Sequence, residues 1–354
     1  MAGFDNGSGP WVPLSREQKR NQFHHDPANP QKTWRRLHDD MISIGDSYFN
    51  HGFGKARLRE SLRDFWDELI HAAKITPADS PELDRLVTLI LEARELGHFA
   101  RRPGSMTSNM ANLGRMDNEE RLWCDLPYLA REFQDAWGNE SASYSATERE
   151  SLAALTAKLV AVGVCSDQLS GCALWFLKET LETERPLRGP NSQDHPEQTN
   201  SEPSVVDLLP ACDAWFQHGR FKLAQRSLVN FNPDVSMWSN ENIQMSSLPG
   251  GLALEAGVTQ PGFSVKRWLF WRQRLKDFYD SGDAQIAGLA RACFEEIVMA
   301  GMKVGLEIPG EREYLRNLFK ALREELTARG PKGCVWPEEI EIDMGWAEEN
   351  KSTN

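Results

Sequence analysis

The stretch AQIAGLARACFEEIVMAGMKVGL, residues Ala284 to Leu306, decides the fold that we predict for this chain. It is apolar on almost every side of a helix, and such a helix is typical of the middle of a helical bundle. Glu296, Met299 and Lys303 follow one another at helical spacing, which places them on one face. Because burying an ammonium group without a partner is costly, Lys303 either reaches water at the helix C-terminus or meets an anionic group.

The rest of the chain repeats apolar residues at helical intervals, and no run of alternating β-branched residues with turn pairs indicates a strand. Ser80 and Pro81 form an N-cap followed by a proline at the first helical position, which marks a helix start. We therefore predict an all-α protein, a single large helical bundle of about ten helices. The predicted helices are residues 32–48, 56–74, 83–96, 126–137, 148–164, 167–184, 205–225, 264–280, 284–306 and 311–329.

Composition sets the expected domain organisation. Residues 1–30 are rich in Pro, Gly and Asn and are predicted to form an irregular lead-in. Residues 31–330 form the all-helical domain, interrupted at about 185–203 by a Pro-rich polar insertion that we expect to be disordered. Residues 331–354 are an acidic tail. The loops at 97–117 and 229–262 are candidate lids over a site, and the first of them also suits an ordinary exposed connection.

Charge and cysteine usage exclude several classes of protein. The formal net charge is -12 and no Lys/Arg-dense run occurs, which argues against general nucleic-acid binding. No apolar run approaches the roughly 18 residues of a membrane span, and the N-terminus lacks the apolar core of a signal peptide. The six cysteines form no CxxC pair and are expected to be reduced and structural. We expect a cytoplasmic protein without a membrane span, and we make no prediction of its oligomeric state.

Missing catalytic signatures narrow the enzyme classes. The sequence holds no GxxxxGK[ST], no GxGxxG after a strand, no HExxH and no GxSxG. What remains is a helical interior with 12 tryptophans, a lysine in an apolar helix, an arginine-rich helix and carboxylates on helices. That set suits ionisation of an allylic diphosphate, in which Mg²⁺ and cationic side chains neutralise the leaving group and an aromatic cavity shelters the carbocation.

The carboxylates Asp64, Asp67 and Glu68 have a DxxDE spacing on one helix. They are our candidate ligands for one or two Mg²⁺ ions, although acidic residues on the solvated face of any helix have the same spacing. The aspartate-rich box of familiar terpene cyclases is not reproduced, because Asp39 and Asp40 are not followed by the required aspartate. The second metal-binding box of those enzymes is absent as well.

Six segments carry a resemblance to a known group of proteins. FWDELIHAAK, SPELDRLVTLI, LWCDLP, CALWFLKETLE, LLPACDAWFQHG and RWLFWRQRL resemble, in this order over residues 55–325, a large group of uncharacterised fungal all-helical proteins. Within that group the chain resembles the atypical humulene synthases of fungal tropolone sesquiterpenoid pathways. The resemblance implies cyclisation of farnesyl diphosphate without the usual aspartate boxes, with a binuclear Mg²⁺ cluster and an essential lysine one helical turn after an apolar gatekeeper.

Met299 and Lys303 stand at that spacing, so the resemblance implies that Lys303 binds the diphosphate and that Met299 shapes the cavity. The predicted function is a Mg²⁺-dependent sesquiterpene cyclase, a carbon–oxygen lyase of fungal secondary metabolism that converts a prenyl diphosphate into a humulene-type hydrocarbon. The alternative is a non-catalytic helical binding or scaffold protein, in which Lys303 pairs with Glu296 or with the helix dipole. From chemistry alone we add residues that assist the diphosphate and line the cavity, namely Arg272, Arg274, Trp268 and Trp271.

Overall fold

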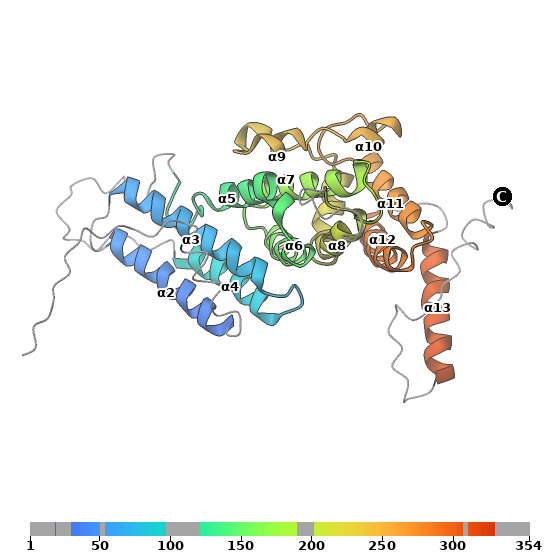
Figure 1. Ribbon diagram of the computed structural model, residues 1–354, viewed down its shortest axis with the longest axis horizontal. Coiled ribbons are helices and arrows are strands. Elements are labelled where there is room, and N and C mark those ends of the chain that lie inside the picture. The colour runs from blue at the N-terminus through green and yellow to red at the C-terminus, as the bar shows by residue number, and fades with distance from the viewer. Residues whose placement is uncertain are drawn as a thin grey trace, which may run out of the picture. The chain divides into compact units, whose positions relative to one another are not determined.

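The computed structural model describes residue 18 and residues 30–49, 54–96, 120–189, 202–306 and 311–329. Within these ranges the regular elements are helices and no strand occurs, which confirms the prediction of an all-α protein (Figure 1). Four predicted segments lie outside the described residues, namely the lead-in before residue 30 apart from residue 18, most of the insertion (190–201), the loop at 97–117 and the tail from 331.

Residue contacts group the chain into two compact units, Met1–Ala136 and Trp137–Asn354, and each unit is described by itself. The single helical domain expected over residues 31–330 stays a prediction. The N-terminal unit, coloured blue to green in Figure 1, contains α2 (Pro30–Phe49), α3 (Lys55–Ile75), α4 (Pro81–Leu96) and α5 (Leu129–Asp135). In this unit α3 packs against α2, α4 and α5.

The core of the N-terminal unit is aromatic. Phe65, Trp66 and Trp123 are buried, and their ring centroids lie 4.8–6.0 Å apart in edge-on or tilted contacts. Such contacts are favoured because the positive edge of one ring meets the negative face of another. Trp66 also donates a hydrogen bond from Nε1 to the carbonyl oxygen of Pro127 at 2.8 Å, so its polar atom is satisfied inside the core.

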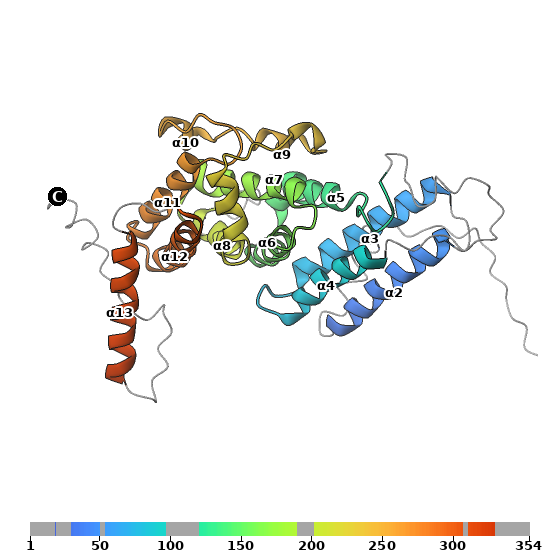
Figure 2. The same cartoon turned by 180° about the vertical axis from the view of Figure 1, so that it is seen from behind.

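The C-terminal unit is built around α8 (Val205–Leu228), which packs against α6 (Ala146–Ala161), α7 (Ser166–Leu177), α11 (Val265–Tyr279) and α12 (Ala284–Val304). Figures 1 and 2 show α8 between α6 and α12 from opposite sides. Small residues allow the close approach of α6 and α8, since a Cβ added at Gly219 meets Cβ of Ala157 at 3.5 Å. The remaining α-helix of this unit beyond α12 is α13 (Glu311–Arg329), which agrees with the predicted bounds.

The composition of α12 predicted that this helix lies in the middle of the bundle, and this prediction is wrong. It buries one stripe, which includes Ile286, Cys293 and Ile297, while Ala284 and Gly288 on the other side are exposed. Alanine and glycine count as apolar in the sequence pattern, but they lose little when they face water because they carry so little apolar surface. The central helix of the unit is α8, which packs against α6, α7, α11 and α12 although polar residues are spread along its length.

The segment 229–262, predicted to be mostly loop, contains short helices. They are the 3-10 turn η5 (Val235–Met237), α9 (Glu241–Met245) and α10 (Gly251–Glu255). Asp234 and Asn240 cap the first two of these by accepting hydrogen bonds from Ser236 N and Ile243 N. Each helix is little more than one turn, which is too short for a hydrophobic periodicity to be visible in the sequence.

Candidate functional site

A pocket of about 610 Å³ opens in the C-terminal unit, and we call it the Arg185 pocket. Its lining combines apolar and charged side chains from the 3-10 turn at 141–143, from α6, α7 and α8, and from the ends of the insertion. The lining residues are Ser141, Ala142, Ser143, Arg149, Trp175, Phe176, Glu179, Arg185, Glu202, Pro203 and Leu208.

The apolar side of the Arg185 pocket comes from the last turn of α7 and the first turn of α8. Phe176 and Leu208 are buried, whereas Trp175 keeps part of its ring accessible. Trp175 also lies 6.2 Å, centroid to centroid, from the fully buried ring of Trp137. The aromatic wall is therefore fixed by the core behind it.

Two guanidinium groups form the polar side of the pocket. Arg149 donates hydrogen bonds from Nε to the carbonyl oxygen of Ser141 at 3.0 Å and from Nη2 to that of Ala142 at 3.3 Å. Arg185 donates from Nε to the carbonyl oxygen of Glu179 at 2.8 Å and forms ion pairs with the carboxylates of Glu179 and Glu202. Burial lowers the pKa of Arg149, and the nearby charge of Arg185 lowers it further, while Asp207 and Glu148 act in the opposite direction.

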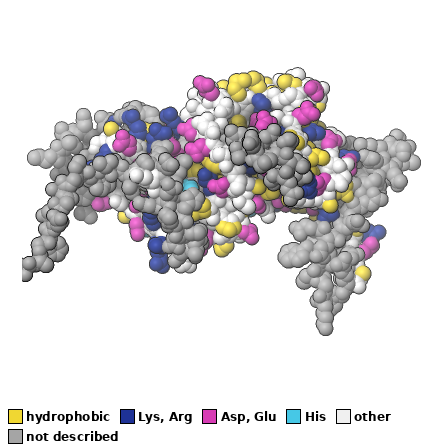
Figure 3. Space-filling model, in the orientation of Figure 1, with side chains coloured by type: hydrophobic (Ala, Val, Ile, Leu, Met, Phe, Trp, Pro, Cys, Tyr) yellow, Lys and Arg dark blue, Asp and Glu magenta, His cyan; other side chains and the backbone are white. Residues whose placement is uncertain are grey.

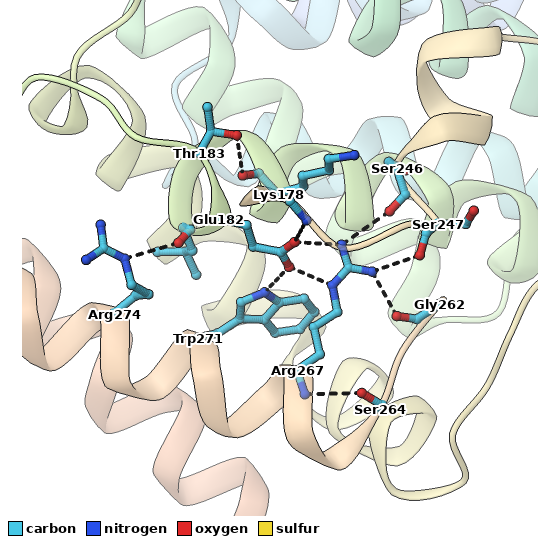
Figure 4. Close-up of polar contacts among 12 residues, drawn as sticks. Lys178, Glu182, Thr183, Ser246, Ser247, Gly262, Ser264, Arg267, Trp271 and Arg274 are labelled. Carbon is cyan, nitrogen blue, oxygen red and sulfur yellow. Dashed lines mark hydrogen bonds and ion pairs between the residues drawn. The ribbon is translucent and has the colours of Figure 1, made fainter. Parts of the chain in front are cut away.

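A second polar cluster, which we call the Glu182 cluster, lies inside the same unit (Figure 4). Glu182 ends the π-helical segment η4 (Lys178–Glu182) that continues α7, and its side chain is fully buried. Its carboxylate accepts hydrogen bonds from Nε and Nη2 of Arg267 at 2.6 and 3.0 Å, and from Nε1 of Trp271 at 2.7 Å. The backbone N–H of Gly250 donates the fourth, at 2.6 Å.

The other edge of the Arg267 guanidinium holds the segment that joins α9 to α11. Nη1 donates to the carbonyl oxygens of Ser247 and Gly262 at 3.1 and 2.9 Å, and Nη2 donates to that of Ser246 at 3.3 Å. Arg267 is fully buried, so the two charges of the pair depend on each other and on these hydrogen bonds, and the nearby charge of Lys178 interacts with both. The cluster is saturated, and its role is to fix the 246–262 segment rather than to bind a ligand.

Lys303, the residue from which the cyclase prediction starts, is exposed in the last turn of α12. The helix ends there at Gly305, which adopts a left-handed φ of 86°. The sequence left two alternatives for Lys303, contact with water or with an anionic group, and in the structure its ammonium group reaches water. Glu296 does not pair with Lys303, because its carboxylate forms an ion pair with Arg220 of α8. Met299 is partly exposed, and neither Met299 nor Lys303 lines the Arg185 pocket.

The predicted cavity residues of α11 lie in the core and at its edge. Trp268 and Trp271 are fully buried and do not line the Arg185 pocket, and Trp271 belongs to the Glu182 cluster. Arg272 is also buried, near the ring of Phe294, and burial lowers the pKa of its guanidinium to about 10. Arg274 is half-buried and donates to the carbonyl oxygen of Leu181 at 3.2 Å and to Asp277 at 3.2 Å. These contacts are structural.

The candidate Mg²⁺ ligands Asp64, Asp67 and Glu68 share α3 in the N-terminal unit, whereas the other predicted site residues belong to the C-terminal unit. Asp67 and Glu68 are buried, so they do not form the solvated face that the alternative reading expects. A carboxylate oxygen of Glu68 lies 3.4 Å from Nη2 of Arg36. Among the described residues, no group of three or more His, Cys, Asp or Glu side chains is placed to hold a metal ion. The described residues therefore do not fit the predicted magnesium cluster, and we derive no step through it.

The residues that form the two polar sites were not predicted from the sequence, above all Arg149, Arg185, Glu182 and Arg267. One signal was available, since Glu182 and Glu179 lie at the end of the strongly apolar stretch CALWFLKETLE, where a carboxylate requires a partner. The partners lie far away in the chain, 85 residues for the Arg267–Glu182 hydrogen bond. No local pattern identifies them.

An exposed apolar surface lies elsewhere on the C-terminal unit. Met245, Leu248 and Leu254 are 58%, 48% and 51% exposed. Figure 3 shows hydrophobic side chains gathered along the edge formed by α9 and α10. Within the described part of the chain, every helix is too short or too polar to cross a membrane.

The fold and the pocket define an all-helical protein with a preformed ligand-sized cavity in its C-terminal unit. A family described as protein of unknown function (DUF3632) matches residues 66–275, and the chain belongs to this family. The match includes the Arg185 pocket and the Glu182 cluster but ends before α12, so Met299 and Lys303 lie outside it. No curated protein and no solved structure matches the chain.

Proposed function

We propose that the C-terminal unit binds a small organic molecule in the Arg185 pocket. The observation that carries this proposal is the volume of about 610 Å³ beside a fixed aromatic wall and a charged rim. Ligand sites in proteins commonly enclose about 300–1,000 Å³ and combine an apolar lining with a few placed polar groups. The pocket meets both criteria.

The chemistry of the lining supports binding rather than catalysis. The hydroxyls and carboxylates of the lining are already engaged: Ser141 and Ser143 donate to the carbonyl oxygens of Trp137 and Glu140, and Glu202 pairs with Arg185. The arginines stay protonated at neutral pH and present donors in a fixed planar fork. Glu179 is held in an ion pair with Arg185. This arrangement suits the recognition of a ligand, which agrees with the binding-protein alternative from the sequence.

Replacing Ala142 by tryptophan is expected to abolish ligand binding. Ala142 lines the pocket yet is exposed, so a large side chain there fills the entrance without disturbing the core. The probe is phenylnaphthylamine, a neutral aromatic molecule, and its binding to the full chain is measured by calorimetry. We expect the native chain to bind the probe, and we expect Ala142→Trp to lower the affinity for it at least tenfold.

The matched control is Ala161→Trp, which adds the same side chain at an exposed position at the end of α6 that does not line the pocket. It is expected to bind like the native chain. Equal binding by the native chain and by both variants would place the probe outside the pocket and overturn the proposal.

A second proposal is the sesquiterpene cyclase implied by the resemblance to atypical humulene synthases. The observation that favours it is the combination of arginines with Trp175 and Phe176 in one pocket, since a prenyl diphosphate joins an anionic head to an apolar chain. The resemblance assigns diphosphate binding to Lys303 and the shape of the cavity to Met299, but neither residue lines this pocket. Lys303 is exposed, and the described residues include no group of three or more His, Cys, Asp or Glu side chains that could hold a metal ion, so this proposal receives less support than ligand binding does.

Incubation of the full chain with farnesyl diphosphate and Mg²⁺, followed by mass spectrometry of hexane extracts, tests the cyclase proposal. If it is right, a humulene-type hydrocarbon forms and Lys303→Ala abolishes turnover while the circular-dichroism melt stays unchanged. Lys222→Ala, at another lysine of the C-terminal unit, is the control and should retain turnover. Absence of hydrocarbon from every prenyl diphosphate tested ends the cyclase proposal and leaves ligand binding untouched.

A further inference from the structure

The Arg185 side chain holds two carboxylates in different ways. Its Nε donates to the carbonyl oxygen of Glu179 and its Nη2 to the carboxylate of the same residue, so Glu179 is held by backbone and side chain together. Nη1 reaches the carboxylate of Glu202 by a single hydrogen bond of 3.2 Å. The side chain of Arg185 is only 8% exposed, and its Nη1 edge faces Glu202.

The two carboxylates also differ in their exposure to water. The side chain of Glu179 is 29% exposed, whereas that of Glu202 is 78% exposed. An ion pair with so exposed a partner contributes little free energy, because water solvates the charge nearly as well as the guanidinium does. Glu202 is therefore a replaceable partner of Arg185, and Glu179 is a fixed one.

Arg149 adds a second cation to the same pocket. Its guanidinium is buried and bonded only to the carbonyl oxygens of Ser141 and Ala142 among the hydrogen bonds described for it. These carbonyls carry no net charge, and the carboxylates of Asp207 and Glu148 offset the positive charge of Arg149 only from a distance. An anion that enters beside Arg185 therefore gains chiefly from Arg185, and Arg149 adds a second, partly offset positive charge.

We propose that the ligand of this pocket is an organic anion whose carboxylate, sulfonate or phosphate group binds Arg185 in place of Glu202, with its apolar body against Trp175. This inference rests on the proposed ligand-binding function. Glu202 acts as an internal competitor, a carboxylate of the chain that occupies the anion position until a ligand displaces it. The guanidinium fork of Arg185 suits all three head groups, because each presents two oxygens in a plane.

Paired probes separate the head group from the body. Anilinonaphthalene sulfonate carries an anionic group, and phenylnaphthylamine has the same aromatic body without it. Glu202→Gln removes the competing charge, so the anionic probe is expected to bind about threefold to tenfold more tightly while binding of the neutral probe is unchanged. Arg185→Gln is expected to lower the affinity for the anionic probe at least tenfold and to leave the affinity for the neutral probe unchanged.

The control for net charge is Glu184→Gln, the same substitution at an exposed residue outside the pocket lining. It should leave the affinity of both probes unchanged. Ala142→Trp should remove both probes, which excludes binding at the exposed surface of α9 and α10. Circular-dichroism melts check that Arg185→Gln is folded, and Glu202→Gln supplies an independent test at an exposed position.

The outcomes distinguish this inference from the function on which it rests. If the neutral probe binds in the pocket but neither Glu202→Gln nor Arg185→Gln changes the affinity for the anionic probe, the anion inference is wrong and ligand binding stands. If Glu184→Gln raises the affinity for the anionic probe as much as Glu202→Gln does, the effect is one of net charge and the inference is wrong as well. If neither probe binds the native chain, ligand binding itself fails.

Discussion

Glu182→Ala is expected to lower the free energy of unfolding by about 3–5 kcal/mol, because it leaves a fully buried guanidinium without its counter-charge. Arg267 has 0% side-chain exposure and receives its only carboxylate from Glu182 among the described contacts. The substitution also removes the acceptor of Trp271 Nε1 and of the Gly250 N–H. Urea unfolding followed by circular dichroism measures the change as a lower midpoint.

The control for this prediction is Asp277→Ala, which breaks the ion pair with Arg274. The side chains of Arg274 and Asp277 are 22% and 43% exposed. Exposed pairs contribute about 0–1 kcal/mol, so this variant should unfold almost like the native chain. The double substitution Glu182→Leu with Arg267→Met is expected to recover part of the loss: it removes the uncompensated charge, but Trp271 Nε1 and the Gly250 N–H still lack their acceptor. A loss for Glu182→Ala no larger than that for Asp277→Ala would contradict the structural role of the cluster.

Gly262→Ala is the second substitution with a large expected effect, about 2–5 kcal/mol of lost stability. Gly262 has φ of 75°, and the left-handed region costs a residue with a Cβ about 1–2 kcal/mol. A Cβ there also meets the carbonyl oxygen of Phe231 at 2.6 Å and Cα of Asn232 at 2.8 Å. Both are backbone atoms, and shifting a packed backbone costs about 1–3 kcal/mol more.

Gly163→Ala separates these two costs. Gly163 has nearly the same dihedral angle, φ of 82°, but a Cβ added there meets no atom within 4 Å. Its loss should therefore be about 1–2 kcal/mol, the conformational part alone. The comparison of urea midpoints gives the cost of the close approach at Gly262. Equal losses in the two variants would show that the backbone at Gly262 shifts at no cost, and would contradict the fixing of this segment by the hydrogen bonds from Arg267.

The sequence by itself determined the long helices of this protein, but not the one-turn helices η5, α9 and α10. Ser80 and Pro81 start α4, and apolar residues at helical spacing locate α3, α11 and α12 within a few residues of their observed bounds. This succeeds because backbone hydrogen bonds and capping are local, so residues within a few positions of one another decide where a helix begins and ends. The long helix α8 extends beyond its predicted end at residue 225 to Leu228.

Only the tertiary structure decided which side chains meet. The composition of α12 made Lys303 look buried, yet its last turn faces water and the exposed positions of the helix carry alanine and glycine. The Glu182–Arg267 pair joins residues 85 positions apart, and the Arg185 pocket takes its residues from a turn, three helices and both ends of the insertion. Helical periodicity indicates which face of a helix is buried but not against which partner, since that choice depends on how all the helices pack at once.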